Sequence, residues 1–238
     1  MLEKLYLHLN HFTGGIPVTL ANLTKLNLLE LRENSLYGSF PKFITKLTQL
    51  SVLNLGTNRL NGNIPEGIGN MSMLEKLYLN NNNLTGTIPK GFGECVALQA
   101  LDLSQNKLNG IIPNSLGNCK SMIVLILTNN SLSGIIPMTL NNCVALERLK
   151  VSENKFSGTL EINFPNSMKV LSAHSNNFFG IVPASLAHCT KLQLLDLSKN
   201  RFIGELPPYL SFFYDLRVLS LGYNKLHGII PGWITNLT

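Results

Sequence analysis

The chain has 238 residues, 45% of them hydrophobic, and its 19 Lys and Arg against 13 Asp and Glu give a net charge of +6. The basic residues are scattered rather than grouped in a stripe, which argues against a nucleic-acid-binding protein. The longest aliphatic run, 123–127, is far too short to span a membrane, and the first residues lack the charged start, apolar run and cleavage site of an export signal. We therefore expect neither a membrane-spanning segment nor a signal peptide in this chain.

An internal repeat of about 24 residues organises the sequence. Gly follows each repeated Asn by four residues, and Pro follows by seven residues in every unit except the one with Glu161. The repeated residues are Asn10, Asn34, Asn58, Asn82, Asn106, Asn130, Asn154, Asn176, Asn200 and Asn224. A fixed period of this length is typical of a solenoid, in which each unit packs mainly against its neighbours. The repeat predicts one elongated domain over residues 1–238, where length alone would suggest one or two rounded domains.

Each unit begins with a Leu-x-Leu pattern, such as Leu101 and Leu103, which predicts a short strand with one buried face. The Asn three positions later stands where the chain must turn, and its amide can bond the backbone of neighbouring units. Gly permits the positive φ of a turn, and Pro fixes an extended exit. The remaining residues, 114–118 in this unit, are too few for a full helix. The predicted class is therefore α/β, with stacked strands in a concave parallel sheet and short helical turns on the convex side.

The four cysteines fall at a core position of the repeat. Cys95, Cys119, Cys143 and Cys189 each precede a repeated Asn by 11 residues, where other units have Leu or Met. A metal site needs ligands that converge from closer spacings such as Cys-x2-Cys. We therefore expect buried free thiols, no metal site and no cofactor.

The pattern L-x-x-L-x-L-x-x-N-x-L-x-G-x-I-P, over residues 2–231, resembles the plant-type leucine-rich repeats of receptor-like kinases and receptor-like proteins. The resemblance implies a right-handed, twisted horseshoe with a second short strand near the Gly-x-Ile-Pro segment. It also implies a place on the extracellular face of the plasma membrane, within a longer parent protein. The unit from Asn154 has only 22 residues, which should shorten its outer segment and disturb the twist. Both ends lack the paired cysteines that cap the family's domains, so we expect an uncapped fragment of a longer protein.

The outward positions of the concave sheet are the expected ligand-binding surface, because this is the family's usual ligand-facing side. The candidate contact residues are Tyr78, Asn80, Asp102, Ser104, Ile126, Arg148, Lys150 and His174. Ile126 would anchor an apolar side chain, and Arg148 with Lys150 an acidic group or a carboxy terminus. The pair is similar to an Arg-x-Arg feature of some family members, although Lys cannot form a planar bidentate fork. The alternative is a solvated face neutralised by Glu147 and Glu153.

A catalytic alternative rests on Asp196 and Ser198, which lie on the strand next to the one that carries His174. An open sheet offers no oxyanion hole and no pocket that excludes water, so these residue types do not predict a hydrolase. The chain also lacks a phosphate-binding Gly-rich loop and kinase motifs. Any kinase activity is expected in another domain of the parent.

Five Asn-x-Ser/Thr sequences occur, a number close to chance in this composition, so only the family resemblance makes glycosylation an expectation. The acceptors are Asn22, Asn70, Asn83, Asn129 and Asn236. We expect a non-catalytic module of a plant receptor that recognises a peptide or protein ligand, with a co-receptor as a further candidate partner. The alternative is a soluble inhibitor of a cell-wall-degrading enzyme, as a related repeat family is for polygalacturonases.

Overall fold

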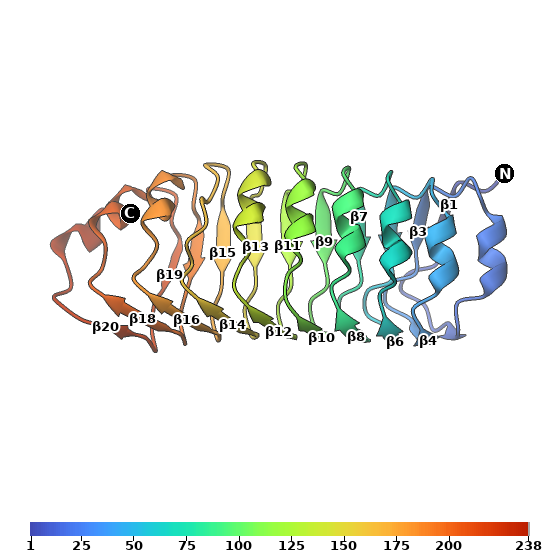
Figure 1. Ribbon diagram of the computed structural model, residues 1–238, viewed down its shortest axis with the longest axis horizontal. Coiled ribbons are helices and arrows are strands. Elements are labelled where there is room, and N and C mark those ends of the chain that lie inside the picture. Colours follow the sequence, from blue (N-terminus) through green and yellow to red (C-terminus); the bar gives the residue numbers. More distant parts are fainter. Residues whose placement is uncertain (238) are drawn as a thin grey trace.

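The computed structural model describes residues 1–237, apart from the side chain of Asn236. Two parallel sheets and a row of short 3-10 helices are stacked unit upon unit along one axis (Figure 1). The first sheet, on the concave side, has ten strands in sequence order. They are β1 (Lys4–Tyr6), β3 (Leu28–Glu30), β5 (Val52–Asn54), β7 (Lys76–Tyr78), β9 (Ala100–Asp102), β11 (Val124–Ile126), β13 (Arg148–Lys150), β15 (Val170–Ser172), β17 (Leu194–Asp196) and β19 (Val218–Ser220).

The second sheet follows the turn of each unit and lies along the lower edge in Figure 1. Its strands are β2 (Thr13–Gly14), β4 (Ser35–Ser39), β6 (Arg59–Asn63), β8 (Asn83–Thr87), β10 (Lys107–Gly110), β12 (Ser131–Gly134), β14 (Lys155–Gly158), β16 (Asn177–Gly180), β18 (Arg201–Gly204) and β20 (Lys225–Leu226). Their register is staggered by two residues, since Asn109 of β10 pairs with Ser131 of β12. The second strand implied by the family resemblance is therefore present.

The helices cover the convex side. They are η1 (Val18–Asn22), η2 (Lys42–Lys46), η3 (Glu66–Asn70), η4 (Lys90–Glu94), η5 (Asn114–Asn118), η6 (Met138–Asn142), η7 (Ala184–His188), η8 (Pro208–Phe212) and η9 (Gly232–Asn236). Each one follows a proline in extended conformation, as Pro113 with φ −69° and ψ 139° precedes η5. The predicted short helical turns are thus confirmed. No helix among residues 1–237 combines the length and apolar character that crossing a bilayer requires.

The core is a continuous stack of aliphatic side chains between the sheets and the helices. In the unit that begins at Leu98, residues Leu101, Leu103, Leu108 and Leu116 are fully buried. Phe156, Phe178 and Phe202 stack with ring centroids 6.3 and 6.5 Å apart where three later units have Phe in place of Leu. The repeat pattern therefore describes the core correctly.

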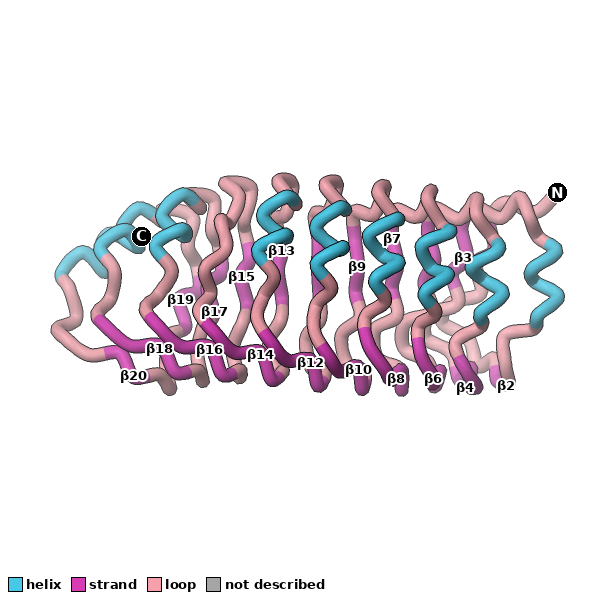
Figure 2. Tube along the Cα trace, in the orientation of Figure 1, coloured by secondary structure: helices cyan, strands magenta, loops and turns pink. Residues whose placement is uncertain are grey.

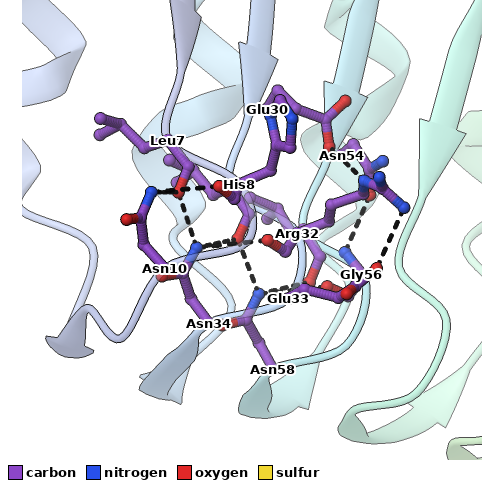
Figure 3. A network of polar contacts seen from close by, with 12 residues as sticks. Leu7, His8, Asn10, Glu30, Arg32, Glu33, Asn34, Asn54, Gly56 and Asn58 are labelled. Atoms are coloured by element: carbon purple, nitrogen blue, oxygen red, sulfur yellow. Dashed lines mark hydrogen bonds and ion pairs between the residues drawn. The ribbon is translucent and has the colours of Figure 1, made fainter.

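The repeated asparagines fasten each turn to the preceding unit. The amide oxygen of Asn106 accepts a hydrogen bond from the N–H of Leu84, and its amide nitrogen donates to the carbonyls of Leu79, Leu103 and Ser104. Figure 3 shows the same arrangement at Asn34 and Asn58. The side chain thus satisfies backbone groups that the turn leaves without a partner.

The 22-residue unit from Asn154 lacks a helix. The chain runs without one from the end of β14 to the start of β15, and Figure 2 shows the resulting gap in the row between η6 and η7. Glu161 stands here at the position where each η helix has its preceding proline. The predicted shortening of the outer segment is confirmed, and the loss of the whole helical turn goes beyond it.

Candidate ligand-binding face

The register of the first sheet brings the predicted central row together. Tyr78 pairs with Asp102, Asp102 with Ile126, and Ile126 with Lys150. All four side chains are half-buried. Because neighbouring strands lie about 4.8 Å apart, the row displays a phenol, a carboxylate, an alkyl group and an ammonium at regular steps.

Some side chains two residues after the central row are held by hydrogen bonds within the sheet, which the repeat position alone does not predict. The carboxylate of Asp102 accepts hydrogen bonds from the N–H and the hydroxyl of Ser104, at 2.9 and 2.6 Å. The hydroxyl of Ser152, a buried residue, lies 2.8 Å from that of Ser172. Some polar groups of this face therefore already have hydrogen-bond partners within the sheet and are less available to a ligand.

The Ser, His and Asp side chains of the catalytic alternative are bonded in another way. The hydroxyl of Ser198 donates to the carboxylate of Asp196 at 2.7 Å, and Nδ1 of His174 lies 3.1 Å from the hydroxyl of Ser175. Within residues 1–237, no hydrogen bond joins Ser198 to His174. In this geometry His174 is not positioned as a general base for Ser198.

Arg148 and Lys150 project from β13 without an ion-pair partner among residues 1–237. Of the two acids in the neutralised alternative, Glu147 forms a 2.8 Å ion pair with Lys169, and Glu153 forms no ion pair with Arg148 or Lys150 within residues 1–237. Two unpaired cations two residues apart on one strand can both contact an anionic group.

A hollow of about 340 Å³ lies over β3, β5 and β7, and sequence analysis missed most of its lining. The lining residues are Arg32, Glu33, Asn54, Gly56, Thr57, Tyr78 and Asn80. Gly56 creates the space, because a Cβ there would press against the amide of Asn80. The amide oxygen of Asn54 accepts a hydrogen bond from the N–H of Gly56 at 3.0 Å (Figure 3). The signal in the sequence that could have predicted this hollow is the glycine at position 56, in a row where most other units have a larger residue.

Charges around this hollow are paired locally. Arg32 lies 3.6 Å from a carboxylate oxygen of Glu30 and 3.1 Å from one of Glu33 (Figure 3). Burial raises the pKa of Tyr78 above its ordinary value, and the carboxylates of Asp102 and Glu30 add to that rise. Tyr78 thus stays a neutral hydrogen-bond donor and acceptor at physiological pH.

Comparison with known proteins shows which family has this architecture. A leucine-rich repeat model matches residues 48–108, 72–122 and 97–156, and a second leucine-rich repeat model matches residues 1–23, 191–213 and 215–237. The chain belongs to the leucine-rich repeat family. Its repeats are of the plant type found in receptor kinase ectodomains. No curated protein matches the chain significantly.

Solved structures of plant receptors resemble this leucine-rich repeat chain over most of its length. The ectodomain of the Arabidopsis receptor kinase HAESA, in complex with an IDA peptide hormone, is 35% identical with a TM-score of 0.93, over 99% of this chain and 40% of that one. A TDR receptor is 32% identical with a TM-score of 0.93, over 99% and 41%. The plant peptide hormone receptor RGFR1, in complex with RGF2, is 30% identical with a TM-score of 0.85, over 94% and 40%. The chain thus spans about two fifths of each of these receptors.

The cysteines of the leucine-rich repeat core are free and buried, as predicted. Burial raises the pKa of Cys95 and Cys143 to about 11 and that of Cys119 and Cys189 to about 12. The thiols are therefore neutral and unreactive in the folded chain. Over residues 1–237, no group of three His, Cys, Asp or Glu side chains is arranged to hold a metal ion.

The predicted glycosylation acceptors occupy several parts of the repeat. Asn22 and Asn70 are the last residues of η1 and η3, Asn83 begins β8, and Asn129 stands with φ 55° in the turn after β11. All four are exposed. The side chain of Asn236 lies outside the described part of the structure, so that acceptor remains a sequence-based prediction.

Proposed function

We propose that this leucine-rich repeat chain is the ligand-recognition part of a plant cell-surface receptor and binds an extended peptide along its first sheet, without catalysis. The observation that carries the proposal is the row from Tyr78 through Ile126 to Lys150, whose chemistry changes at each strand. HAESA and RGFR1, which the chain resembles, are described in complex with peptide hormones. The ligand-binding role of these particular residues is our inference from their position and chemistry.

In this binding mode, the ligand crosses the strands. Tyr78 and Lys150 are three strands apart, about 14 Å, which an extended peptide spans with four or five residues. An aliphatic side chain of the ligand packs on Ile126, and its carboxy terminus meets Arg148 and Lys150. Since Ile126 and Lys150 are neighbours, the aliphatic residue stands next to the ligand's carboxy-terminal residue.

A defined peptide pool tests this arrangement. The probe is a pool of hexapeptides that have Ile at the penultimate position and a free carboxylate, compared by calorimetry with the same pool as carboxamides. We expect amidation to weaken binding to the natural chain about tenfold, because it removes the charge that both cations share. A chain with Arg148→Ala and Lys150→Ala should bind the two pools equally.

The matched control is Lys107→Ala with Lys225→Ala, which removes two exposed cations from the second sheet. This control should keep the full preference for the free carboxylate. An equal loss of preference in the control, or no preference in the natural chain, would refute the anchoring role of β13.

We also propose that the chain works on the extracellular face of the plasma membrane as part of a longer parent protein. Support comes from its likeness to an Arabidopsis receptor kinase ectodomain and from the exposure of the four described acceptor asparagines. A glycan on Asn129 would stand at the edge of the first sheet and restrict access to the neighbouring part of the binding face.

A further inference from the structure

The solvent face of the second sheet has an apolar patch between β10 and β18. In each unit, the residues one, three and five positions after the repeated Asn point outward from the second sheet. Between β10 and β18, five of these positions carry large apolar side chains, here called the lateral patch: Ile111, Ile135, Phe179, Ile181 and Ile203, between 48% and 65% exposed. Ile111 lies over Gly134 and Ile135 over Gly158, so these side chains reach from one unit to the next. The unit from Asn154 has polar Lys155, Ser157 and Thr159 at these positions, and Thr159 stands between Ile135 and Ile181. A group of exposed apolar side chains on one face marks an interaction site more often than isolated exposed residues do.

A hollow of about 380 Å³ opens beside this patch, where the row of helices is interrupted. It is lined by Met138, Thr159, Leu160, Glu161, Ile162, Asn163, Ile181, Pro183, Ala184 and Ser185. Ile181 belongs to both the lateral patch and the hollow, which are therefore continuous. The hollow exists because the unit from Asn154 has no helix to fill the space between η6 and η7.

The hollow is lined by a buried hydroxyl, that of Ser185. The equivalent hydroxyl of Thr139 on η6 also lacks a partner within residues 1–237, although η5 precedes that helix. In the regular unit of η5, the hydroxyl of Ser115 donates to the carbonyl of Lys90 on the preceding helix, at 2.7 Å. Ser185 is the equivalent residue of η7, and its buried Oγ has no hydrogen-bond partner among residues 1–237. A buried hydroxyl without a partner costs free energy that a ligand's backbone group would recover.

A row of cations borders the patch. Lys107, Lys155 and Arg201 are exposed at the first outward position of β10, β14 and β18, and none of them has an ion pair within residues 1–237. Arg201 donates a hydrogen bond to the amide of Asn177, which leaves its charge uncompensated. The acids nearby are Glu161 at the hollow and Glu205 one residue beyond β18. A second copy of this chain would place its own row of cations against Lys107, Lys155 and Arg201. The charge of this surface therefore favours a different, acidic partner.

We infer that the lateral patch docks a second protein, which presents an aromatic or aliphatic side chain with acidic residues beside it. The apolar side chain fills the hollow between η6 and η7, a backbone group contacts Ser185, and the acids pair with Lys155 and its neighbours. Lys155 and Thr159 are four residues apart, so the acids stand about 13 Å from the apolar side chain. No Asn-x-Ser/Thr sequence occurs between residues 130 and 235, so the part of this surface from β14 to β18, with the hollow, carries no N-linked glycan. This surface is distinct from the proposed peptide-binding face.

A fluorescent peptide serves as the probe. It is an acetylated and amidated hexapeptide with Phe first and Asp and Glu last, and its partner has Lys and Arg in place of the two acids. We expect the acidic peptide to bind the full chain in fluorescence polarisation, with about tenfold weaker binding after Ile181→Ser or Lys155→Glu. Ile181 is 65% exposed, so its replacement should leave the thermal midpoint unchanged.

Two controls separate this surface from others. Tyr37→Ser removes a 57% exposed aromatic residue from the same sheet at its other end and should leave binding unchanged. Arg148→Ala should also bind this peptide normally, so the two proposals fail independently. Equal binding of the basic peptide, an equal loss after Tyr37→Ser, or no binding at about 1 mM would overturn the inference. So would a dimer in sedimentation that Ile181→Ser dissociates, because the occupant would then be a second copy.

Discussion

The side chain of Asn106 connects a turn to the unit before it. Its amide oxygen holds the N–H of Leu84 at 3.0 Å, and its amide nitrogen reaches the carbonyl of Leu79 at 3.0 Å. Both backbone groups are buried and lie in the preceding unit. The side chain is therefore part of the contact between units, and the same role at each repeat explains why the period of Asn is so regular.

We expect Asn106→Ala to lower the free energy of unfolding by about 2–3 kcal/mol, because it leaves a buried N–H and a buried carbonyl without partners. Urea unfolding followed by circular dichroism measures the change. Asn109→Ala, an exposed position of the same unit, is the control and should change stability by less than about 0.5 kcal/mol. A similar loss in both variants would contradict the role assigned to Asn106.

At the residue scale, periodicity predicted which side chains of the binding face are neighbours, and the pairing of Tyr78, Asp102 and Ile126 follows that prediction. Periodicity could not predict the bond from Ser104 to Asp102 or the ion pair from Lys169 to Glu147, because these depend on side-chain rotamers and on competition among nearby partners. The hollow at Gly56 could not be predicted from sequence for a related reason. Its shape depends on how the neighbouring side chains surround a residue that has no side chain of its own.

At the scale of elements, the helices on the convex side pack so closely that some positions admit only glycine. A Cβ on Gly117 of η5 would overlap the carbonyl of Thr139 on η6. At Gly67 of η3, the nearest atom to such a Cβ is the hydroxyl of Thr45 at 3.4 Å, an ordinary contact. The two glycines therefore differ in what they contribute, although both lie in the same kind of helix.

Gly117→Ala should destabilise the chain by about 1–3 kcal/mol, because either η5 or η6 must shift to remove the overlap. Gly67→Ala should be neutral or slightly stabilising, because alanine restricts the unfolded chain more than glycine does. Thermal unfolding of the two variants beside the natural chain measures both changes. An unchanged midpoint for Gly117→Ala would mean that the helices are less closely packed than described.

The strands and most helices could be predicted because each unit repeats the same local signals, and Pro113 and Gly110 mark the same boundaries as their equivalents elsewhere. The unit from Asn154 departs from this consensus in two ways at once. It has two residues fewer and Glu161 in place of proline, and together these changes remove the helical turn. Sequence indicated that this unit was disturbed, but the hollow beside Ser185 depends on how the neighbouring helices pack around the gap.

At the scale of the whole molecule, the buried cysteines link stability to pH. Four thiols in four units keep their protons in the folded chain to a pKa of about 11 or 12, against an ordinary value of 9.0. Above the ordinary value, the unfolded chain loses these protons while the folded chain keeps them. The unfolded state then binds fewer protons, so stability is complete below the ordinary thiol pKa and declines as pH rises.

We therefore expect the urea midpoint to fall progressively from about pH 9 up to about pH 11 to 12, where the folded thiols themselves lose their protons. A variant with all four cysteines replaced by Val should show a much flatter profile over this interval. Tyr78 and Tyr209, whose pKa values are also raised by burial, extend the decline to higher pH in both chains. A variant profile as steep as the natural one would show that other groups cause the alkaline loss.

The gap in the row of helices changes how the units on either side of it are connected. Each helix from η1 to η6 contacts the next, and so do η7 to η9, whereas no contact joins η6 to η7 within residues 1–237. Across the unit from Asn154, the two units on either side are connected by the two sheets and by a few hydrogen bonds of the outer segment, such as Ser167 to Leu146 and Cys189 to Pro165. The row of contacting helices is therefore divided into two runs, η1 to η6 and η7 to η9, on either side of this unit. A partner bound across this unit would add contacts between the two runs of helices at the one place in residues 1–237 where the row lacks them.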